Sequence, residues 1–511
     1  MAESKYDIVI IGSGIGGLVC GNLLAKEGLR IAVLEKNKQI GGSLQTFARD
    51  KTIFDSGVHY IGGLDKGQNL YQIFDYLGVM DKLKLQRMDE NGFDRIIIGN
   101  DTKEYRLAQG YENFVQQLLK DFPEEETALR NYCKKIKAVC AKFPLYNLRT
   151  KGLYEEKAEA LREDTRTVIE SLTDNEKLQA VLVGNNALYV GIPYETPFYV
   201  HALIVNSYIE SAWKCINGGS QIGKLLSANI RSLGGEIFRH CDVQKIHVEG
   251  DKAIYAETAD GRKFYADKFI SNIHPSKTME LTTTDVIRKV YRRRLRNLPH
   301  TISSFLVHIV LKKDCFRYLK HNYYFHKEGE IWNLTEYTED NWPLGYAIFL
   351  PPASQTEEFA KAMTIFTYMR YEEVAPWQDT FNTVLFENER GESYKAFKRY
   401  KAGILIDTVE ERFPGLKNCI ASYTTSTPLS YRDYIGNYDG SLYGIAKDYK
   451  DPLKTFISPR TKVQNLYLTG QNINIHGVLG STISSLLTCI TLLESEEIVE
   501  KIKNAQTEKN R

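Results

Sequence analysis

Three features are scarce or missing in this 511-residue sequence, and each absence excludes a class of protein. No run of about 18 or more apolar residues occurs, so we expect no membrane-spanning helix. The eight cysteines include no Cys-x-x-Cys pair, so we expect free, buried thiols and no metal site. Neither sign of charge dominates: 66 Lys and Arg against 64 Asp and Glu leave a net charge of +2, which gives no reason to expect nucleic acid as a partner.

The first residues of the sequence do not resemble a secretory signal. Met1 to Tyr6 are mostly charged or polar and lead directly into an apolar run, which leaves no room for the apolar core of a signal peptide. We therefore expect a cytoplasmic protein. A chain of 511 residues exceeds one compact core, so two domains, or one domain with large insertions, are expected.

Aromatic residues, by contrast, are abundant, with 32 tyrosines and 22 phenylalanines. One interpretation is that they are ordinary core and surface residues. The other is that they line a cavity for a large apolar ligand, because aromatic rings supply broad contact area and tyrosine adds a polar tip.

The strongest motif begins with an apolar run, Ile8 to Ile11, which predicts a buried strand. Three spaced glycines follow: Gly12 permits a tight turn, Gly14 lets the backbone approach a pyrophosphate, and Gly17 lets a helix pack closely on the strand. A second apolar run ends at Glu35, 23 positions after Gly12, where a carboxylate is expected to bind an adenosine ribose. Together these features predict dinucleotide binding.

Two further glycine-rich segments follow this motif. Gly41 and Gly42 suit a second close approach of the backbone to a cofactor phosphate, although the pair is also compatible with an ordinary loop. His59 and Tyr60 lie between glycines, where their polar tips would face a cofactor ring. His59 is alternatively a packed loop histidine.

The rest of the chain alternates between helical and strand patterns. Apolar residues recur at three- and four-residue spacing over Tyr111 to Asp121 and Glu124 to Phe143, which predicts helices. Strand signals return from 215 to 280, with a type I′ hairpin turn expected at Asp260-Gly261. We therefore expect an α/β protein in which a Rossmann-like domain is interrupted by a mixed α+β substrate domain. The expected dinucleotide-binding domain comprises 1–68, 215–285 and 455–500, the substrate domain comprises 69–214 and 286–454, and 501–511 form a polar tail.

Two stretches of the expected substrate domain stand out. Tyr291 to Arg296 forms a basic cluster, which is either a solvated helix face or a contact with anionic lipid head groups. The stretch 424–444 is expected to be a loop unusually dense in tyrosine, with Tyr431 and Tyr443 among its members.

The last informative stretch, Asn465 to Cys489, predicts a strand, a glycine turn, a loop and a glycine-initiated helix. A helix N-terminus presents free N–H groups and a positive dipole end, which suit a flavin pyrimidine or a phosphate. No second strand-turn-helix fingerprint occurs in the sequence, so a separate nicotinamide-binding domain is not expected.

Taken in order, these segments resemble the flavin-dependent carotenoid desaturase, carotenoid isomerase and retinol saturase family, within the wider amine-oxidase-like flavoproteins, nearly from end to end. The segments 57–62 and 469–472 look most like the all-trans-retinol 13,14-reductase branch. Ser43 departs from the many desaturases that carry arginine after the double glycine, which weakens a plain phytoene-desaturase interpretation. The matching pieces are Ile11 to Gly17 with Glu35, Gly41 to Ser43, Asp55 to Gly62, Gly218 to Ser220 with Gly234 and Gly235, Ala266 to Asn272, Thr427 to Leu429 with Tyr443 and Gly444, and Leu468 to Asn472 with Gly477 to Ser481.

The resemblance implies an FAD-dependent oxidoreductase acting on carbon–carbon double bonds of a hydrophobic polyene, isoprenoid or other lipid, with hydride transfer from reduced flavin and an electron donor or acceptor still to be identified. Rival activities are carotenoid desaturation, non-redox cis–trans isomerisation and, more distantly, flavin-free binding of prenyl groups by an escort protein. The candidate polar groups near the ring are His59 and Tyr60, followed by Tyr431 and Tyr443. The residues implied to bind FAD are Gly12, Gly14, Gly17, Glu35, Gly42, Ser43, Val243, Gly470, Gln471, Gly480 and Ser481.

Overall fold

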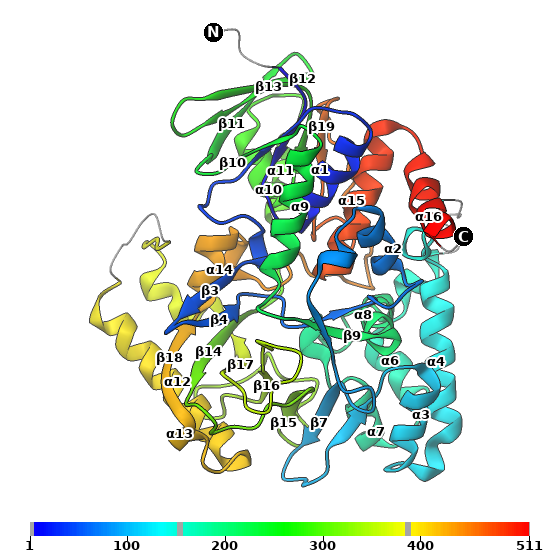
Figure 1. Ribbon diagram of the computed structural model, residues 1–511, viewed down its shortest axis with the longest axis vertical. Coiled ribbons are helices and arrows are strands. Elements are labelled where there is room, and N and C mark those ends of the chain that lie inside the picture. Colours follow the sequence, from blue (N-terminus) through cyan, green and yellow to red (C-terminus); the bar gives the residue numbers. More distant parts are fainter. Residues whose placement is uncertain (1–4, 151–156, 384–389, 510–511) are drawn as a thin grey trace.

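The computed structural model describes residues 5–150, 157–383 and 390–509. Within this part of the chain, two seven-stranded sheets form the centres of the two halves of the molecule. The first sheet lies in the upper half of Figure 1 and the second in the lower half. All strands of the first sheet come from the segments 1–68, 215–285 and 455–500, and all strands of the second come from 69–214 and 286–454.

The first sheet is built around β1, which pairs in parallel with β2 on one side and with β13 on the other. β13 also pairs with β19 in parallel and with β12 in an antiparallel hairpin. This combination places the carboxyl ends of β1, β2, β13 and β19 at one edge, where ligands bind in open α/β sheets. The strands are β10 (Glu236–Phe238), β2 (Ile31–Leu34), β1 (Tyr6–Ile11), β13 (Lys263–Ser271), β12 (Lys252–Thr258), β11 (Val243–Glu249) and β19 (Leu466–Leu468).

Both faces of the first sheet are covered. Ile8 and Ile10 of β1 pack into one apolar cluster, whereas Val9 and Ile11 pack into another, as the alternation of a strand requires. The first cluster includes residues of three helices, of which α1 contacts both of the others. These helices are α1 (Ile15–Lys26), α9 (Ser220–Ser232) and α15 (Gly477–Leu493).

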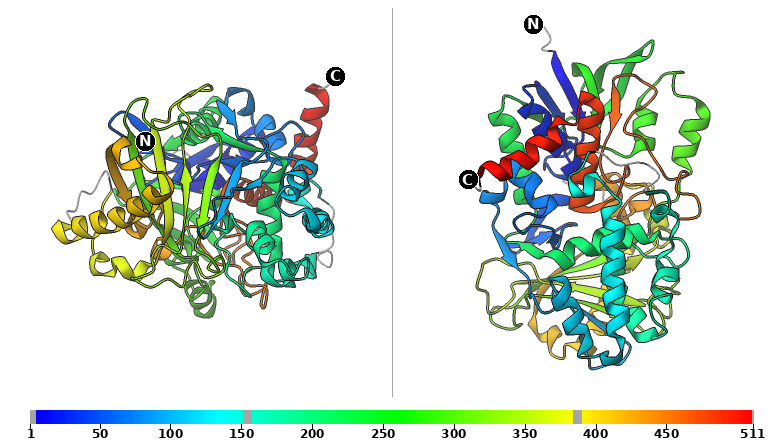
Figure 2. Two further views of the ribbon diagram at one scale, coloured as in Figure 1. Left: turned by 90° about the horizontal axis from the view of Figure 1, so that it is seen from below. Right: turned by 90° about the vertical axis from the view of Figure 1, so that its right-hand side faces the viewer.

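The second sheet is mainly antiparallel and has helices on two sides. The helices α3, α4 and α8 lie on one side of its strands and α12 lies on the other (Figures 1 and 2). The helices are α3 (Tyr111–Leu119), α4 (Glu126–Ala141), α8 (Phe198–Glu210) and α12 (Gly391–Arg412). In order, the strands are β18 (Ile420–Ser426), β14 (Ser303–Leu311), β17 (Ala362–Met369), β16 (Gly345–Phe349), β15 (Asn322–His326), β7 (Asp94–Ile98) and β8 (Tyr105–Leu107).

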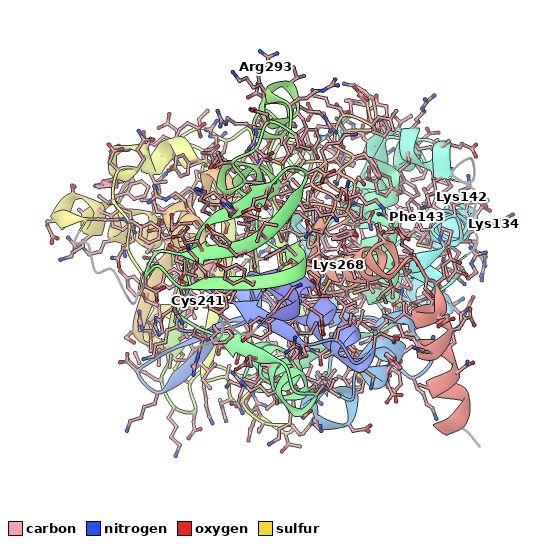
Figure 3. The ribbon with its side chains drawn as sticks, turned by 90° about the horizontal axis from the view of Figure 1, so that it is seen from above. Lys134, Lys142, Phe143, Cys241, Lys268 and Arg293 are labelled. Carbon is pink, nitrogen blue, oxygen red and sulfur yellow. A yellow bond between two sulfur atoms is a disulfide. The ribbon has the colours of Figure 1, made fainter. Side chains whose placement is uncertain are left out.

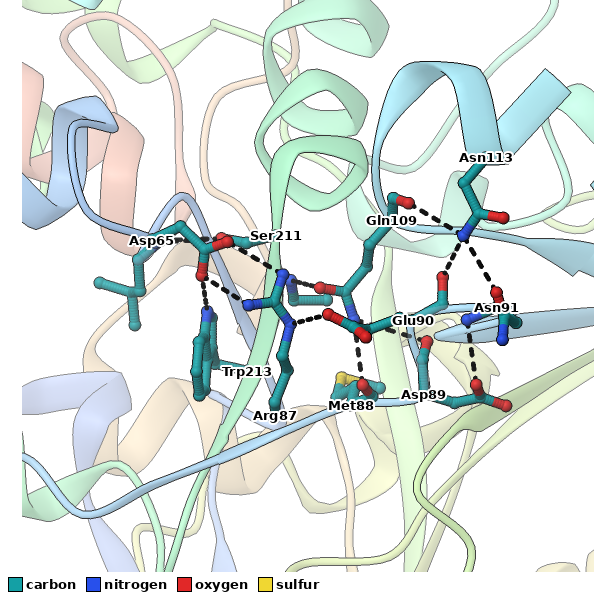
Figure 4. Close-up of polar contacts among 12 residues, drawn as sticks. Asp65, Arg87, Met88, Asp89, Glu90, Asn91, Gln109, Asn113, Ser211 and Trp213 are labelled. Carbon is teal, nitrogen blue, oxygen red and sulfur yellow. Dashed lines mark hydrogen bonds and ion pairs between the residues drawn. The ribbon is translucent and has the colours of Figure 1, made fainter. Parts of the chain in front are cut away.

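A small sheet of β5 (Ile61–Gly62), β9 (Ala212–Cys215) and β6 (Leu85–Arg87) joins the two halves. Arg87 of β6 forms a two-pronged ion pair with Asp65, and the indole of Trp213 on β9 donates to the same carboxylate over 3.1 Å (Figure 4). Bidentate Arg–carboxylate pairing fixes geometry as well as adding energy. The network therefore holds the short strand β5, and with it Tyr60, in a defined position.

The expectation of free thiols was wrong for two of the eight cysteines. Cys315 and Cys419 form a disulfide, with their Cα atoms 5.4 Å apart. Cys315 follows β14 and Cys419 directly precedes β18, and the antiparallel pairing of these strands brings together two positions separated by 104 residues. The six remaining cysteines are free and buried.

Three local expectations also differ from the structure. Residues 501–509 are the end of helix α16 (Glu497–Lys509), whose Ile502 is fully buried, and do not form a tail. The tyrosine-dense stretch contains helix α14 (Pro428–Ile435), which begins with a reciprocal capping box of Thr427 and Ser430. Of Asp260 and Gly261, Gly261 alone has a positive φ, so the hairpin turn is not of type I′.

Candidate functional site

A cavity of about 770 Å³ is lined by residues from both halves of the molecule. Its walls come from the turn before α1, the end of β2, the start of α15, and aromatic side chains around the second sheet. Every residue implied to bind FAD except Gly17 lies on its surface, as do all four candidate polar groups. One continuous space therefore holds both sets.

The turn after β1 is packed so closely that side chains would not fit. Gly12 has φ +93°, and its N–H donates to Leu34 over 2.8 Å. A Cβ on Gly14 would lie 2.9 Å from the amide of Asn272, and a Cβ on Gly16 would lie 2.9 Å from the Cα of Gly470. The backbone at the start of α1 therefore borders the cavity directly, and its free N–H groups suit a phosphate.

Gly17 does not line the cavity; it allows helix α1 to pack closely on β1. A Cβ at this position would lie 2.2 Å from the carbonyl oxygen of Gly12 and 3.2 Å from Ile10. Helix α1 would have to move away from β1 to accept any side chain there.

Glu35 is buried at the end of β2 and borders the cavity. Its Oε2 accepts hydrogen bonds from the backbone N–H of Ser13 at 3.1 Å and from the Ser13 hydroxyl. Its Oε1 accepts from the N–H of Asn37 at 2.8 Å. A carboxylate has about four acceptor sites, so one of them is left for a ligand hydroxyl.

The C-terminal segment lines the cavity beside the glycine turn. Gly470 has φ +97°, and a Cβ on Gly480 would lie 2.4 Å from the carbonyl oxygen of Ile475. The first turn of α15, including Val478 and Ser481, lines the cavity. Gly42, Ser43, Val243 and Gln471 complete this part of the lining. Two helix N-termini, a close-packed glycine turn and a buried carboxylate are a donor set that fits a dinucleotide such as FAD.

The four candidate polar groups differ in what their side chains contact. Tyr443 stacks on the ring of His476 at 3.9 Å between centroids, and its hydroxyl donates to the carbonyl oxygen of Ala187 over 2.9 Å. The hydroxyl of Tyr431 accepts from Ser304 at 3.1 Å, and burial raises the pKa of Tyr431 to about 12.

His59 and Tyr60 lie on the wall nearest the second sheet. The His59 ring stacks on Phe349 at 4.4 Å, and burial, with a smaller contribution from the Lys214 cation, lowers the pKa of His59 to about 3. The imidazole is therefore neutral near pH 7. The Tyr60 hydroxyl donates to Asp94 over 2.8 Å and lies 2.7 Å from the hydroxyl of Tyr324.

Sequence reasoning missed the charged groups behind this wall. Burial raises the pKa of Asp55 to about 7 and that of Asp94 to about 6, and it lowers the pKa of Lys214 to about 7. The Lys214 ammonium donates to the carbonyl oxygen of Leu350 over 3.2 Å. In the sequence, Asp94 and Lys214 stand out only as charged residues directly beside apolar or aromatic ones. That pattern does not indicate that the two side chains lie near each other in the fold.

The basic cluster forms part of helix α11 (Lys289–Arg296). Arg292 turns inward and donates to backbone carbonyl oxygens, among them those of Thr282 and Thr284. Arg293 points outward at the edge of the molecule (Figure 3). Among the described residues, no helix is both long enough and apolar enough to cross a bilayer, and no cluster of three or more potential metal ligands is found.

A glycine turn, a buried acid and a second helix N-terminus around one cavity are the features of a dinucleotide-binding protein of the α/β class. The chain belongs to the flavin-containing amine oxidoreductase family, because the family model matches residues 15–485. The family resemblance and the α/β fold expected from the sequence are therefore confirmed.

The sequence identities to individual proteins are low. The all-trans-retinol 13,14-reductase of Danio rerio is 28% identical, with 98% of this chain and 89% of that protein covered. The chloroplastic prolycopene isomerase 2 of an Oncidium hybrid cultivar is 25% identical over 92% of this chain and 80% of that protein. Among solved structures, an oxidoreductase from Methanosarcina mazei is similar in fold, with a TM-score of 0.62 at 15% identity, covering 96% of this chain and 100% of that one.

Proposed function

We propose that the protein is an FAD-dependent oxidoreductase that saturates a carbon–carbon double bond of a hydrophobic polyene or isoprenoid, most like an all-trans-retinol 13,14-reductase. The observation that carries the proposal is that the glycine-lined part of the cavity is continuous with an aromatic part. The aromatic part includes Tyr199, Tyr208, Phe349 and Phe366. Aromatic walls of this kind bind an extended apolar ligand by burying its surface.

A polyene has no acidic proton and no leaving group, so side chains alone do not reduce it, and bound reduced FAD supplies the hydride. The chain's own residues have other tasks. The aromatic walls hold the ligand and exclude water, and a polar group supplies the proton for the second carbon.

Among the four candidates, the contacts distinguish the roles. His59 is held neutral by burial, so we assign it to packing against Phe349 and not to proton donation. The Tyr443 proton is engaged by Ala187, so this residue orients the wall beside His476. Tyr60 donates to the carboxylate of Asp94, whereas the Tyr431 hydroxyl accepts from Ser304, so the Tyr431 proton is available to a ligand.

Two rival activities would use the same cavity. A desaturase would remove two hydrogens from the substrate, and a cis–trans isomerase would leave its mass unchanged. The isomerase alternative is supported by the 25% identity to a prolycopene isomerase. A flavin-free escort protein for prenyl groups is the distant alternative, and a purified protein without flavin colour would favour it.

The test is anaerobic mixing of the FAD-loaded, chemically reduced protein with retinol or a carotenoid. We expect the flavin to reoxidise and the product to gain two hydrogens by mass spectrometry. A flavin that stays reduced, with substrate of unchanged mass and geometry, would contradict the proposal. Product of unchanged mass but altered geometry would favour the isomerase.

We further propose contact with a membrane on the cytoplasmic side, through which the lipid substrate is reached. Val290 on α11 is 67% exposed, and Leu453 and Phe456 are 62% and 53% exposed. Arg294 ties these two segments together by donating to the carbonyl oxygens of Leu453 and Phe456. Exposed apolar side chains among basic ones are the composition that binds anionic lipid surfaces, and both Leu453 and Phe456 also border the cavity.

A further inference from the structure

A chain of three hydrogen-bonded groups leads from the cavity wall into the protein. Tyr324 and Tyr60 both line the cavity, and their hydroxyl oxygens are 2.7 Å apart. The Tyr60 hydroxyl is in turn 2.8 Å from Oδ2 of Asp94, a residue with no solvent exposure. Asp94 is therefore reached from the cavity through the two tyrosines.

Asp94 is held by neighbours that fix its orientation. β7 and β15 pair in parallel with Asn322 directly beside Asp94, and the Asn322 amide donates to Oδ1 over 3.0 Å. The Asn185 amide donates to Oδ2 over 3.1 Å. Neither amide titrates, so the carboxyl group stays in place whether it is ionised or protonated.

The protonation state of Asp94 determines which group donates in each of the two hydrogen bonds. When Asp94 is ionised, the single Tyr60 proton is donated to Asp94, so the contact between the tyrosines requires Tyr324 to donate to Tyr60. When Asp94 is protonated it donates to Tyr60, Tyr60 donates to Tyr324, and the Tyr324 proton is free to point into the cavity. One proton on Asp94 therefore converts Tyr324 from a donor to Tyr60 into a donor to the ligand.

We propose that Asp94 is the proton reservoir of the site, that Tyr60 relays its proton, and that Tyr324 delivers a proton to the ligand carbon. The inference rests on the proposed reduction of a double bond. In the step, the Tyr324 O–H bond breaks as the C–H bond forms, Tyr324 regains a proton from Tyr60, and Tyr60 regains one from Asp94. Asp94 ends as a carboxylate, and the hydride on the neighbouring carbon comes from the reduced flavin.

The charged and titratable surroundings of Asp94 are compatible with this role. Burial raises the pKa of Asp94 to about 6, whereas the hydrogen bonds from Asn185, Asn322 and Tyr60 and the Lys214 cation oppose the rise. The groups that face the relay are Lys214 from β9, Tyr208 from α8 and Tyr443, and Lys214 in turn faces Asp55, His59 and His321.

Substitution of the relay separates proton delivery from binding. Tyr60→Phe and Tyr324→Phe keep the rings but interrupt the chain, so we expect kcat to fall roughly 100-fold or more while KM changes little. Wild-type kcat is expected to fall as the pH rises above about 6, because Asp94 loses its proton; in Tyr60→Phe this dependence disappears. The matched control is Tyr105→Phe. Tyr105 lies on β8, which pairs with β7, and its hydroxyl likewise donates to an aspartate, Asp101, so its loss should leave kcat and KM unchanged.

A second measurement needs no turnover. Infrared difference spectra of the FAD-loaded protein between about pH 5 and about pH 8, without substrate, should contain a carboxylic acid band that is lost in Asp94→Asn. They should also contain a tyrosine signal that is lost in Tyr324→Phe. In Tyr60→Phe the acid band should remain and the Tyr324 signal should vanish, because the link is cut.

The outcomes distinguish the relay from the proposed reaction. Absence of the Asp94 band, or a Tyr324 signal that persists in Tyr60→Phe, overturns the relay even if wild-type protein reduces a polyene. The relay would also be overturned if Tyr60→Phe and Tyr324→Phe had the same kcat and the same pH dependence as the wild-type protein. If the infrared responses occur but no substrate is reduced, the proposed reaction fails and the coupling of the three groups stands.

Discussion

The backbone nitrogen of Ser13 lies 3.1 Å from a carboxylate oxygen of Glu35. This hydrogen bond joins the turn at the start of α1 to the end of β2, so the two parts expected to hold a dinucleotide are also held to each other. The hydroxyl of the same serine accepts a hydrogen bond from the N–H of Gly41 over 3.2 Å, which draws in the second glycine segment.

Glu35→Gln is expected to weaken FAD binding. Loss of a charged acceptor typically costs about 1.5–3 kcal/mol, which corresponds to roughly a 10- to 100-fold higher Kd. Flavin fluorescence titration of the apoprotein measures this. Glu249→Gln, at the exposed end of β11, is the matched control; equal FAD affinity in all three proteins would exclude Glu35 as a ligand.

Gly17→Ala should destabilise the fold, because its Cβ would lie 2.2 Å from the backbone oxygen of Gly12. Overpacking of this kind costs about 1–3 kcal/mol or more, to be measured as the free energy of unfolding in denaturant. Gly403→Ala on α12 is the opposite case, since nothing lies within 4 Å of its Cβ position, and should stabilise the protein by about 0.5–1 kcal/mol. Equal effects of the two changes would refute the packing role.

Acid should destabilise the protein through its buried histidines. A histidine whose pKa is lowered on folding takes up its proton in the unfolded state first, so the free energy of unfolding falls as the pH drops below about 6.5. Asp55 and Asp94, whose pKa values are raised, act in the opposite direction below about pH 7 and 6. They are outnumbered by histidines with a pKa lowered to about 3 or 4, namely His59, His201, His274, His308, His321, His326 and His476.

His308→Gln tests this expectation at one position. Glutamine does not titrate but still has hydrogen-bonding groups for Thr364 and Ser426, so the variant should lose less stability than wild type between about pH 7 and 5. The exposed His240→Gln serves as the comparison and should follow wild type. Identical pH curves for all three would show that folding does not lower the pKa of His308.

Thiol counting tests the disulfide. Alkylation of the denatured protein without reductant should modify six cysteines, and reduction should expose two more, in the peptides containing Cys315 and Cys419. Mass spectrometry of the digested protein identifies them. Eight modified cysteines before reduction would contradict the pairing.

The membrane contact predicts a specific loss of vesicle binding. Leu453→Asp and Val290→Asp remove exposed apolar surface and add like charge to the anionic lipid, so each should weaken co-sedimentation with phosphatidylserine vesicles by roughly tenfold. Added salt should weaken wild-type binding as well. Leu233→Asp, an exposed leucine at the end of α9, is the control; the contact is refuted if it has the same effect.

Much of the first half of the site could be predicted from the sequence because it is local. Strand, turn, helix and second strand follow one another between Tyr6 and Glu35, and each is specified by apolar spacing or by a glycine. The start of α14 was also predictable in principle from the local capping pair Thr427 and Ser430, although the stretch was expected to be a loop. The Cys315–Cys419 pair was not readable, because its partners are joined only by the pairing of β14 with β18.

The sequence by itself determined the class of cofactor site, since the glycine turn, Glu35 and the start of α15 are defined by short-range pattern. The tertiary structure alone decided which polar groups meet at the aromatic end. Tyr60 is separated by 34 residues from Asp94 and by 264 from Tyr324, and their contact depends on the register that places Asn322 beside Asp94. Local pattern determines which residues form a strand, but the pairing of distant strands determines which side chains come within hydrogen-bonding distance.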